Sequence, residues 1–308
     1  MSTLTPAVTP EDTPAPPTKN RPSALANAKS MLSSRVATVI AIVIAVLWTI
    51  PTAGLLITSF RKPLDINRSG WWTVLQNPSF TLDNYRLALG SGTSSLADEF
   101  VNSIVITIPA VLLPILLATL AAYAFAWMDF KGRNLLFVAV FTMQIVPIQV
   151  TMIPLLSLYV NTLHLNGTFW SVWLSHTIFA LPLAVFLMHN FIKEIPAELV
   201  EAARVDGAGH VRIFFRVMLP LLTPALAAFG IFQFLWVWND LLVSLVFLGG
   251  SPEFRPITVA ISELAGTRGS AWFLLSAGAF IAMVVPVVVF LSLQRYFVRG
   301  LLAGGLKG

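Results

Sequence analysis

Long apolar stretches without Asp, Glu, Lys or Arg alternate with short charged segments along the chain. A helix that crosses the hydrocarbon of a bilayer needs about 20 consecutive, mostly apolar residues. Residues 36–60, 100–128 and 269–294 are each long enough for one crossing. Residues 134–192 are too long for one crossing, and their polar centre at 161–167 predicts a turn between two helices.

A fifth apolar stretch begins after Arg216 and contains one acid. It is apolar as far as Asn239, meets Asp240 and continues to Leu248. We expect a single long helix that carries this acid. The five stretches together predict an all-α integral membrane protein, a bundle of six transmembrane helices.

The Lys and Arg residues predict the orientation of the bundle, because short cytoplasmic segments carry an excess of them. If the N-terminus is inside, six of the 19 basic residues lie on the outer side and the other 13 on the cytoplasmic side. The six are Arg61, Lys62, Arg68, Arg86, Arg255 and Arg268. We therefore expect both termini to be cytoplasmic.

The segments outside the core helices have distinct compositions. Residues 1–34 are rich in Pro, Ala, Ser and Thr and predict a disordered cytoplasmic tail. The apolar run after them is too long for the core of a signal peptide, so it predicts a first transmembrane helix at 35–60. Residues 61–99 contain aromatic residues and predict short helices at the outer surface. A core transmembrane domain at 100–300 and a cytoplasmic tail at 301–308 follow.

Composition excludes several functions. Hydrophobic residues make up 56% of the chain and charged residues 11%, against roughly a quarter charged in a soluble domain. The chain has no cysteine, so a disulfide framework and a thiol nucleophile are excluded. The net charge of +5 does not predict a nucleic-acid partner, because the basic residues flank apolar stretches and do not share one face.

Residue patterns typical of catalytic sites are also missing from the sequence. The phosphate-cradling motif G-x-x-x-x-G-K-[ST] is absent, so the chain does not bind ATP by that route. Its four histidines, His164, His176, His189 and His210, are isolated from one another in the sequence and are interpreted as structural. We expect no catalytic residue and no metal site.

The cytoplasmic segment 193–218 predicts two short helices joined by a bend. Pro196 suits a first helical turn, where its missing N–H costs nothing. Gly207 suits the left-handed position that ends a helix, and Ala202 and Ala203 keep one side of the first helix flat.

The second of these helices is predicted to be amphipathic. Val211, Phe214, Phe215 and Met218 follow the spacing of one helical face and predict an apolar stripe, with Arg212 on a basic edge beside it. A helix that lies on lipid headgroups shows the same pattern. The pattern alone leaves a membrane surface and a protein partner as alternatives.

The order of residues in this segment resembles a known signature. Glu201-Ala-Ala, then Asp206-Gly-Ala, then Leu219-Pro is similar to the cytoplasmic loop of permease subunits of bacterial ATP-binding-cassette importers. In that family the loop holds a coupling helix that docks in a cleft of the ATPase subunit, and its glutamate pairs with a basic group there. The resemblance assigns the ATPase contact to Glu201, Ala202, Ala203, Asp206, Gly207, Arg212 and Phe214.

Further segments resemble the carbohydrate-uptake members of this family. They are Asn84-Tyr85, residues 121–126, residues 130–133 and the C-terminus. The C-terminus is similar to the tail of the maltose-type permease that reaches into its ATPase partner. By this resemblance Gly304, Gly305 and Lys307 contact the ATPase, although Leu302 stands where the family usually has Thr.

The resemblance implies an assembly and a mechanism. The chain would be the permease of an ATP-driven sugar importer in the bacterial cytoplasmic membrane, with a second permease, two ATPase subunits and an extracytoplasmic sugar-binding protein as partners. ATP and Mg would be bound by the ATPase and transport would follow alternating access, so the chain itself would not be an enzyme. Similarity of residues 236–242 to α-glucoside permeases favours an α-glucoside or another oligosaccharide as substrate.

Polar side chains within the predicted spans are candidates for the sugar pathway. Gln233, Asp240 and Ser244 form one stripe on the predicted fifth helix, with Trp236 beside it, and Gln144 lies on the third helix. Hydroxyl groups of a sugar need hydrogen-bond partners, and its C–H face packs on an indole ring. The alternatives are that Asp240 caps a helix or forms a structural pair, that the tryptophan is an interfacial anchor, and that Gln144 packs against a neighbouring helix.

Three other functions remain as alternatives. An importer permease for another solute would share the cytoplasmic signature. An ion-coupled secondary transporter would need ionisable groups within the membrane, and only Asp240 fits that requirement. A membrane-embedded enzyme would need a paired acid, base, nucleophile or metal site, which these spans do not provide.

Overall fold

The computed structural model describes residues 35–90, 95–249, 251–265 and 271–305. The predicted disordered tail at 1–34 lies outside them. The chain divides into two compact units, residues 1–53 and residues 54–308, and each is described by itself. The first described helix, α2 (Arg35–Ser59), begins in the first unit and ends in the second.

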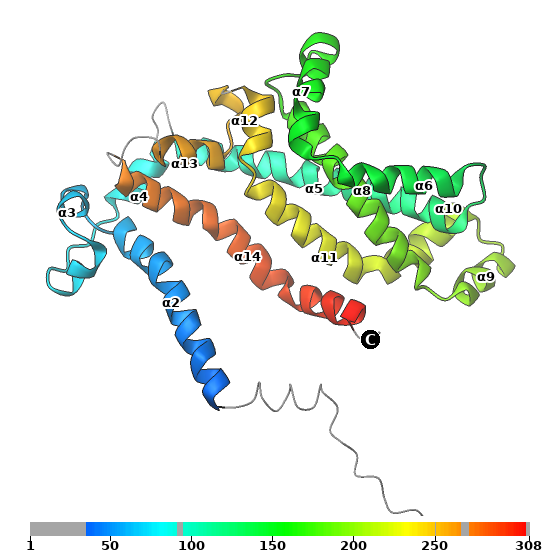
Figure 1. The fold of residues 1–308 in the computed structure, drawn as a ribbon, viewed down its shortest axis with the longest axis horizontal. Coiled ribbons are helices and arrows are strands. Elements are labelled where there is room, and N and C mark those ends of the chain that lie inside the picture. Colours follow the sequence, from blue (N-terminus) through cyan, green and yellow to red (C-terminus); the bar gives the residue numbers. More distant parts are fainter. Residues whose placement is uncertain (1–34, 91–94, 250, 266–270, 306–308) are drawn as a thin grey trace, which may run out of the picture. The chain divides into compact units, whose positions relative to one another are not determined.

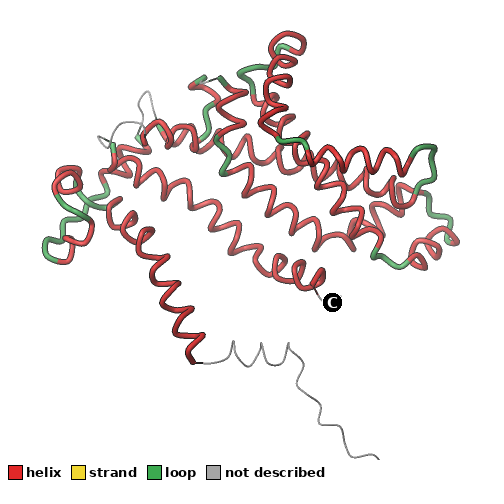
Figure 2. The backbone as a smooth tube through the Cα atoms, viewed as in Figure 1, coloured by secondary structure: helices red, strands yellow, loops and turns green. Residues whose placement is uncertain are grey.

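The described residues form helices joined by turns and short loops, with no strand among them (Figure 2). After α2 the order is α3 (Pro63–Arg68), a 3₁₀ turn (Trp71–Leu75), α4 (Asp83–Leu89), α5 (Leu96–Trp127), α6 (Arg133–Thr142), a 3₁₀ turn (Met143–Ile145), α7 (Ile148–Leu158), a π turn (Tyr159–Leu163), α8 (Phe169–Lys193), α9 (Ala197–Val205), α10 (His210–Ile213), a π turn (Phe214–Met218), α11 (Leu219–Trp238), α12 (Leu242–Leu248), a 3₁₀ turn (Pro252–Phe254), α13 (Ile257–Ala265) and α14 (Trp272–Gly305). The all-α prediction is confirmed.

In the second unit, α9 and α10 lie at one end of the long helices, and α4 and α13 lie at the other (Figure 1). We call the end that carries α9 and α10 the loop end, and the end that carries α4 and α13 the opposite end. Helix α5 runs from the opposite end to the loop end and packs against α8 and α11, while α11 also packs against α14.

Five helices in the described part of the chain are long and apolar enough to cross a membrane. They are Val36–Ser59, Leu96–Trp127, Phe169–Lys193, His210–Trp238 and Trp272–Gln294. A bent pair, Arg133–Ile145 with Ile148–Leu163, supplies a sixth crossing if its two arms count as one span. The six predicted spans correspond to these five helices and this pair.

The bent pair turns through 104° at a proline. Val146 and Pro147 both leave the helical conformation, with ψ angles of 121° and 130°. Proline has no N–H to continue the hydrogen-bond ladder, and it disfavours the helical conformation of the residue before it. The predicted turn after this pair is present, and its backbone takes positive φ at His164 and Gly167.

The prediction of one long helix up to Leu248 was wrong. Helix α11 ends at Trp238, and α12 begins only at Leu242. The reason is the acid between them. The Asp240 carboxylate accepts hydrogen bonds from the backbone N–H groups of Val243 (3.1 Å) and Ser244 (2.9 Å), which lie in the first turn of α12 and have no partner within the helix.

Two features hold the helices of the second unit together. Small residues, including Ala110, Ala118 and Ala122 of α5 and Ala184 of α8, are fully buried and allow close approach of the helices. At the loop end, larger side chains from several elements form one cluster, which we call the loop-end core. Its buried members include Tyr123, Phe125, Val185, Met188, Ile192, Val200, Ile213, Phe214, Met218 and Leu222.

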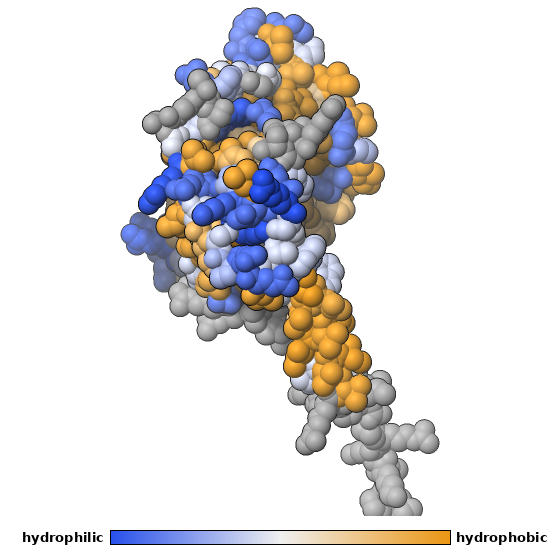
Figure 3. All heavy atoms as spheres, turned by 90° about the vertical axis from the view of Figure 1, so that its left-hand side faces the viewer, coloured by the Kyte–Doolittle hydropathy of each residue, from blue (hydrophilic) through white to orange (hydrophobic). Residues whose placement is uncertain are grey.

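The predicted short helices of residues 61–99 are present as α3, the 3₁₀ turn and α4. Asn84, in α4, is fully buried, and its Nδ2 donates to the carbonyl oxygens of Ser59 (2.9 Å) and Arg61 (2.8 Å). The neighbouring Tyr85 hydroxyl lies 2.7 Å from Ser59 Oγ. These bonds fasten α4 to the end of α2. Hydrophilic residues gather on the surface at this end of the unit (Figure 3).

Replacement of Asn84 by Leu should lower the stability of the protein by about 2 kcal/mol, because two buried carbonyl groups lose their donor while the volume is kept. The measurement is thermal unfolding of the detergent-solubilised protein. Asn77→Leu is the control, since Asn77 is exposed. Equal unfolding temperatures for the two variants would show that these hydrogen bonds contribute nothing.

Replacement of Asp240 by Ala should destabilise the protein by about 1–3 kcal/mol, because the first turn of α12 loses its acceptor. Asp240→Asn keeps one acceptor oxygen and should cost less. The exposed acid Asp98, at the start of α5, provides the control Asp98→Ala. A loss of stability no larger in Asp240→Ala than in Asp98→Ala would contradict the role of Asp240 as a cap.

Candidate functional site

The segment between α8 and α11 contains the first predicted short helix as α9. The second is not a separate short helix, because α10 and the π turn continue into α11 as one helical span, His210–Trp238. Pro196 directly precedes α9 with an extended ψ of 134°, so it lies one residue outside the turn predicted for it. We call residues 193–218 the 193–218 loop. One face of this loop packs on the bundle, and the other face is exposed to solvent.

Gly207 forms the bend between α9 and α10, as predicted. Its φ is 78°, a left-handed conformation that side chains with a Cβ disfavour. The Gly207 N–H donates to Arg204 O (3.0 Å), and the next N–H, of Ala208, donates to Ala203 O (2.9 Å). No atom lies within 4 Å of a Cβ added at Gly207, so conformation alone requires glycine here.

The inner face of the loop belongs to the loop-end core. Val200, Ile213, Phe214 and Met218 are each at most 4% exposed. Of the predicted apolar stripe, Phe214 and Met218 are therefore buried, whereas Val211 is 74% exposed. The buried face is centred on Ile213 and Phe214 because a π turn replaces regular α-helix at this point and changes the angular spacing of side chains.

The outer face of the loop carries most of the residues predicted to contact an ATPase. Glu201, Ala202, Asp206, Gly207 and Arg212 are exposed, Ala203 is half-buried and Phe214 is buried. The exposed apolar side chains of this face are Val205, Val211 and Phe215.

A shallow groove of about 530 Å³ runs along part of the outer face. It is lined by Gly207, Gly209, His210, Val211, Arg212, Phe215 and Arg216. Exposed apolar residues beside basic and acidic ones are the chemistry of a protein-binding surface.

The predicted pathway residues of α11 and α12 are mostly engaged inside the protein. Gln233 is 1% exposed, and its Nε2 donates to Ala110 O of α5 (3.1 Å). Ser244 Oγ donates to Asp240 Oδ2 (3.1 Å). The Asp240 carbonyl accepts a hydrogen bond from Thr258 Oγ1 (2.6 Å), at the start of α13. Asp240 therefore fastens α12 and α13 to the end of α11.

His176, in α8, completes this cluster and was not predicted as part of it. Its Nε2 lies 3.7 Å from Asp240 Oδ2, and the Trp236 indole packs edge-on against its ring at 5.3 Å. The pair could not be predicted from the sequence, because the two residues belong to different helices. The structure brings Trp236, Asp240 and Ser244 together through this histidine.

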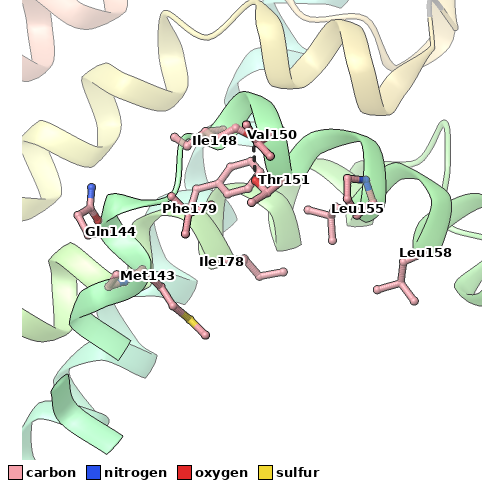
Figure 4. A pocket seen from close by; sticks show the side chains of 12 residues that line it. Met143, Gln144, Ile148, Val150, Thr151, Leu155, Leu158, Ile178 and Phe179 are labelled. Atoms are coloured by element: carbon pink, nitrogen blue, oxygen red, sulfur yellow. Dashed lines mark hydrogen bonds between the residues drawn. The ribbon is translucent and has the colours of Figure 1, made fainter. Parts of the chain in front are cut away.

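Gln144 lies apart from that cluster, in an apolar groove at the bend of the α6–α7 pair (Figure 4). The groove has a volume of about 570 Å³. Its walls are Met143, Gln144, Val146, Ile148, Val150, Thr151, Pro154, Leu155, Leu158, Ile178, Phe179 and Pro182. The Thr151 hydroxyl donates to Ile148 O (2.8 Å), so Gln144 offers the free polar group of the groove lining.

At the opposite end, α5 holds the segment that leads into α13. Arg255 is paired with the buried Glu99 and with Glu263 of α13. Asn102 Nδ2 donates to the carbonyl oxygens of Glu253 (3.0 Å) and Arg255 (3.1 Å). The sequence placed Glu99 just outside a span and did not predict this network. Among the described residues, no group of three His, Asp or Glu side chains could hold a metal ion.

The C-terminal residues predicted to contact an ATPase lie partly outside the described chain. The backbone of α14 is helical as far as Gly305, and it includes Gly304. Lys307 lies outside the described residues.

Comparison with known proteins gives relatives along most of the chain. It is 52% identical over 268 residues to the osmoprotective compounds uptake permease protein GgtD of Synechocystis, which covers 86% of this chain and 89% of that protein. It is 48% identical over 242 residues to the alpha-glucoside transport system permease protein AglG of Rhizobium meliloti, covering 77% of this chain and 63% of that protein.

A solved structure shares the fold. A chain of a bacterial ABC transporter for import of the polysaccharide alginate superposes with a TM-score of 0.62 at 16% identity, covering 89% of this chain and 99% of that one. Residues 110–302 match the family described as "Binding-protein-dependent transport system inner membrane component". The chain thus belongs to this family, as a multi-pass, membrane-embedded permease subunit of an ABC importer and a transport component, not an enzyme.

Proposed function

We propose that this permease imports a sugar, an α-glucoside or another small oligosaccharide, and that it forms half of the translocation pathway. The resemblance of residues 236–242 to α-glucoside permeases favours this substrate class. So does the 48% identity to a protein named as an alpha-glucoside permease, although the chain spans 63% of that relative's length. The family favours an importer over an ion-coupled transporter and over a membrane enzyme.

The observation that carries the proposal is the two-faced 193–218 loop. Its inner face is buried in the loop-end core, while its outer face exposes Glu201, Asp206 and Arg212 beside apolar side chains. A partner that binds the outer face can therefore move the bundle through the inner face. We assign the outer face to an ATPase subunit that binds ATP and Mg, with the C-terminal residues Gly304, Gly305 and Lys307 as a further contact.

This assignment places the loop end and both termini in the cytoplasm. The opposite end, with α4 and α13, then faces the sugar-binding protein. ATP binding would draw two ATPase subunits and their coupling loops together, tilt the helices and open the pathway outward, and hydrolysis would reset it.

The groove at the α6–α7 bend is the part of the pathway that we assign to this chain. Its walls are largely apolar, and Gln144 is their free polar group. A sugar needs several hydrogen-bond partners, so a second permease must supply the others. We assign the cluster of Gln233, Trp236, Asp240 and Ser244 a structural role, because the Gln233 Nε2, the Asp240 carboxylate and the Ser244 hydroxyl are bonded within the protein.

An osmoprotective compound is the second candidate substrate. The 52% identity to a protein named for the uptake of such compounds favours it. The two candidates share the fold and the loop, and they differ in the solute alone.

Gly207→Val should reduce uptake about tenfold or more while the protein still inserts, because a β-branched residue at positive φ strains the bend by at least about 1.4 kcal/mol. Gly249→Val is the matched control. It imposes the same strain at the end of α12, where also no atom lies within 4 Å of a Cβ. Equal uptake by the two variants would contradict a special role of the loop.

Glu201→Lys should abolish copurification of the ATPase subunits, because it reverses the charge of an exposed residue and leaves the core unchanged. Copurification is measured with affinity-tagged permease. Glu253→Lys, an exposed acid near α13, is the control that should retain the ATPase. Retention of the ATPase and of full uptake in Glu201→Lys would rule out docking at this face.

The substrate is tested with the complete importer in proteoliposomes. Labelled maltose, trehalose and glycine betaine are supplied with the cognate binding protein and ATP. We expect saturable, ATP-dependent uptake of an α-glucoside. Uptake of glycine betaine alone would favour the second candidate, and uptake driven by an ion gradient without the ATPase would overturn the proposal.

A further inference from the structure

Tyr123 joins helix α5 to the 193–218 loop. It lies near the loop end of α5, in the loop-end core, and is 5% exposed. Its hydroxyl oxygen lies 2.9 Å from Nδ1 of His210, the first residue of α10. The hydroxyl of a tyrosine both donates and accepts, so this hydrogen bond forms with either tautomer of the histidine.

The tyrosine contacts the loop a second time, one helical turn further on. The Phe214 ring packs edge-on against the Tyr123 ring, with centroids 5.4 Å apart. His210 and Phe214 are four residues apart, so they lie on one face of the helical run that starts with α10. Tyr123 therefore contacts a full turn of this helical run, through a hydrogen bond at the start of the turn and an aromatic contact at its end.

The polar contact lies directly beside the bend of the loop. Gly207 and Gly209 both precede His210, and no atom lies within 4 Å of a Cβ built on either glycine. The bend itself is held by the hydrogen bonds of the Gly207 and Ala208 N–H groups to α9 and by Ala208, which packs against the loop-end core. The Tyr123–His210 bond fixes the first residue after the glycines to α5.

Helix α5 extends from this contact to the other end of the unit. It has 32 residues and is about 48 Å long. Its first turns carry Glu99 and Asn102, which bind the segment leading into α13. A displacement of α5 at the loop end therefore reaches the segment at the opposite end through one continuous helix.

We propose that the Tyr123–His210 hydrogen bond is a positioning contact for energy coupling: it makes the loop and α5 move together when the ATPase moves the loop. This inference rests on the proposed docking of an ATPase at the loop. Without the bond, α5 follows the loop less closely when the ATPase moves it, because only the packed side chains of the loop-end core still join the two. ATP is then hydrolysed with less transport.

The test uses the complete importer and measures sugar transported per ATP hydrolysed. Tyr123→Phe removes the hydroxyl and keeps the ring on Phe214. His210→Leu removes the partner nitrogen, while His210→Asn, of the same size as Leu, restores a polar atom at the position of Nδ1. Tyr159→Phe is the matched control, because Tyr159 is also buried and its hydroxyl accepts a hydrogen bond from Ser175 in another part of the bundle.

We expect Tyr123→Phe and His210→Leu each to lower the transport ratio about fivefold, the equivalent of about 1 kcal/mol, a typical net hydrogen bond. His210→Asn and Tyr159→Phe should stay near the wild-type ratio. The double variant Tyr123→Phe with His210→Leu should also lose about fivefold, because both changes remove one and the same bond.

Three results would overturn the inference. They are a wild-type ratio in Tyr123→Phe, a loss of about 25-fold in the double variant, and a ratio for His210→Asn as low as that for His210→Leu. Failure of the docking proposal is a different result, since Glu201→Lys would then retain its ATPase subunits. If the Tyr123→Phe permease still copurifies with the ATPase subunits but transports less sugar per ATP, the two proposals are separated and this one is supported.

Discussion

The backbone of a chain inside a bilayer must find its hydrogen-bond partners within the protein, because hydrocarbon offers none. This constraint decides where the helices of this permease can be interrupted. Between α11 and α12 the Asp240 carboxylate accepts from two N–H groups of the new helix, and Thr258 donates to the Asp240 carbonyl. At the other interruption Pro147 has no N–H to satisfy. Each break therefore meets the hydrogen-bonding requirement of its backbone in a different way. Each also gives the unit a surface that straight helices would lack.

The positions of the spans could be predicted from the sequence because charged residues bound them, and charge is a local property. The two breaks were harder to predict. The acid at 240 lies within a continuous apolar run, so the pattern predicted a helix through it, although the carboxylate in fact ends one helix and caps the next. The pattern of residues 134–192 predicted a turn at 161–167, whereas the turn of 104° at Pro147 lies within the span before it. His176 and Glu99 gave no signal, since their partners lie far away in the sequence.

The loop was predicted in more detail than the pathway because more of its features depend on residues that are close in the sequence. Gly207 and the short helix α9 depend on neighbouring residues. The burial of Phe214 depends instead on Tyr123, which lies on a different helix. The hydrogen bond between that tyrosine and His210 joins residues 87 positions apart in the sequence. The predicted stripe of pathway residues assumed one straight helix. The Gln233 amide instead donates to α5 and the Ser244 hydroxyl to Asp240, so both groups are bonded within the protein.

The distribution of polar groups bears on where selectivity resides. Four of the five pathway candidates lie in the α11–α12 region, and the polar atoms of Gln233, Asp240 and Ser244 are already bonded. Only Gln144 faces the groove at the α6–α7 bend, whose other walls are apolar apart from an internally bonded threonine. Such a surface cannot distinguish one sugar from another by hydrogen bonds, because discrimination needs several fixed donors and acceptors. We therefore assign selectivity to the partners. To this chain we assign the shape of half the pathway and the transmission of motion to that pathway.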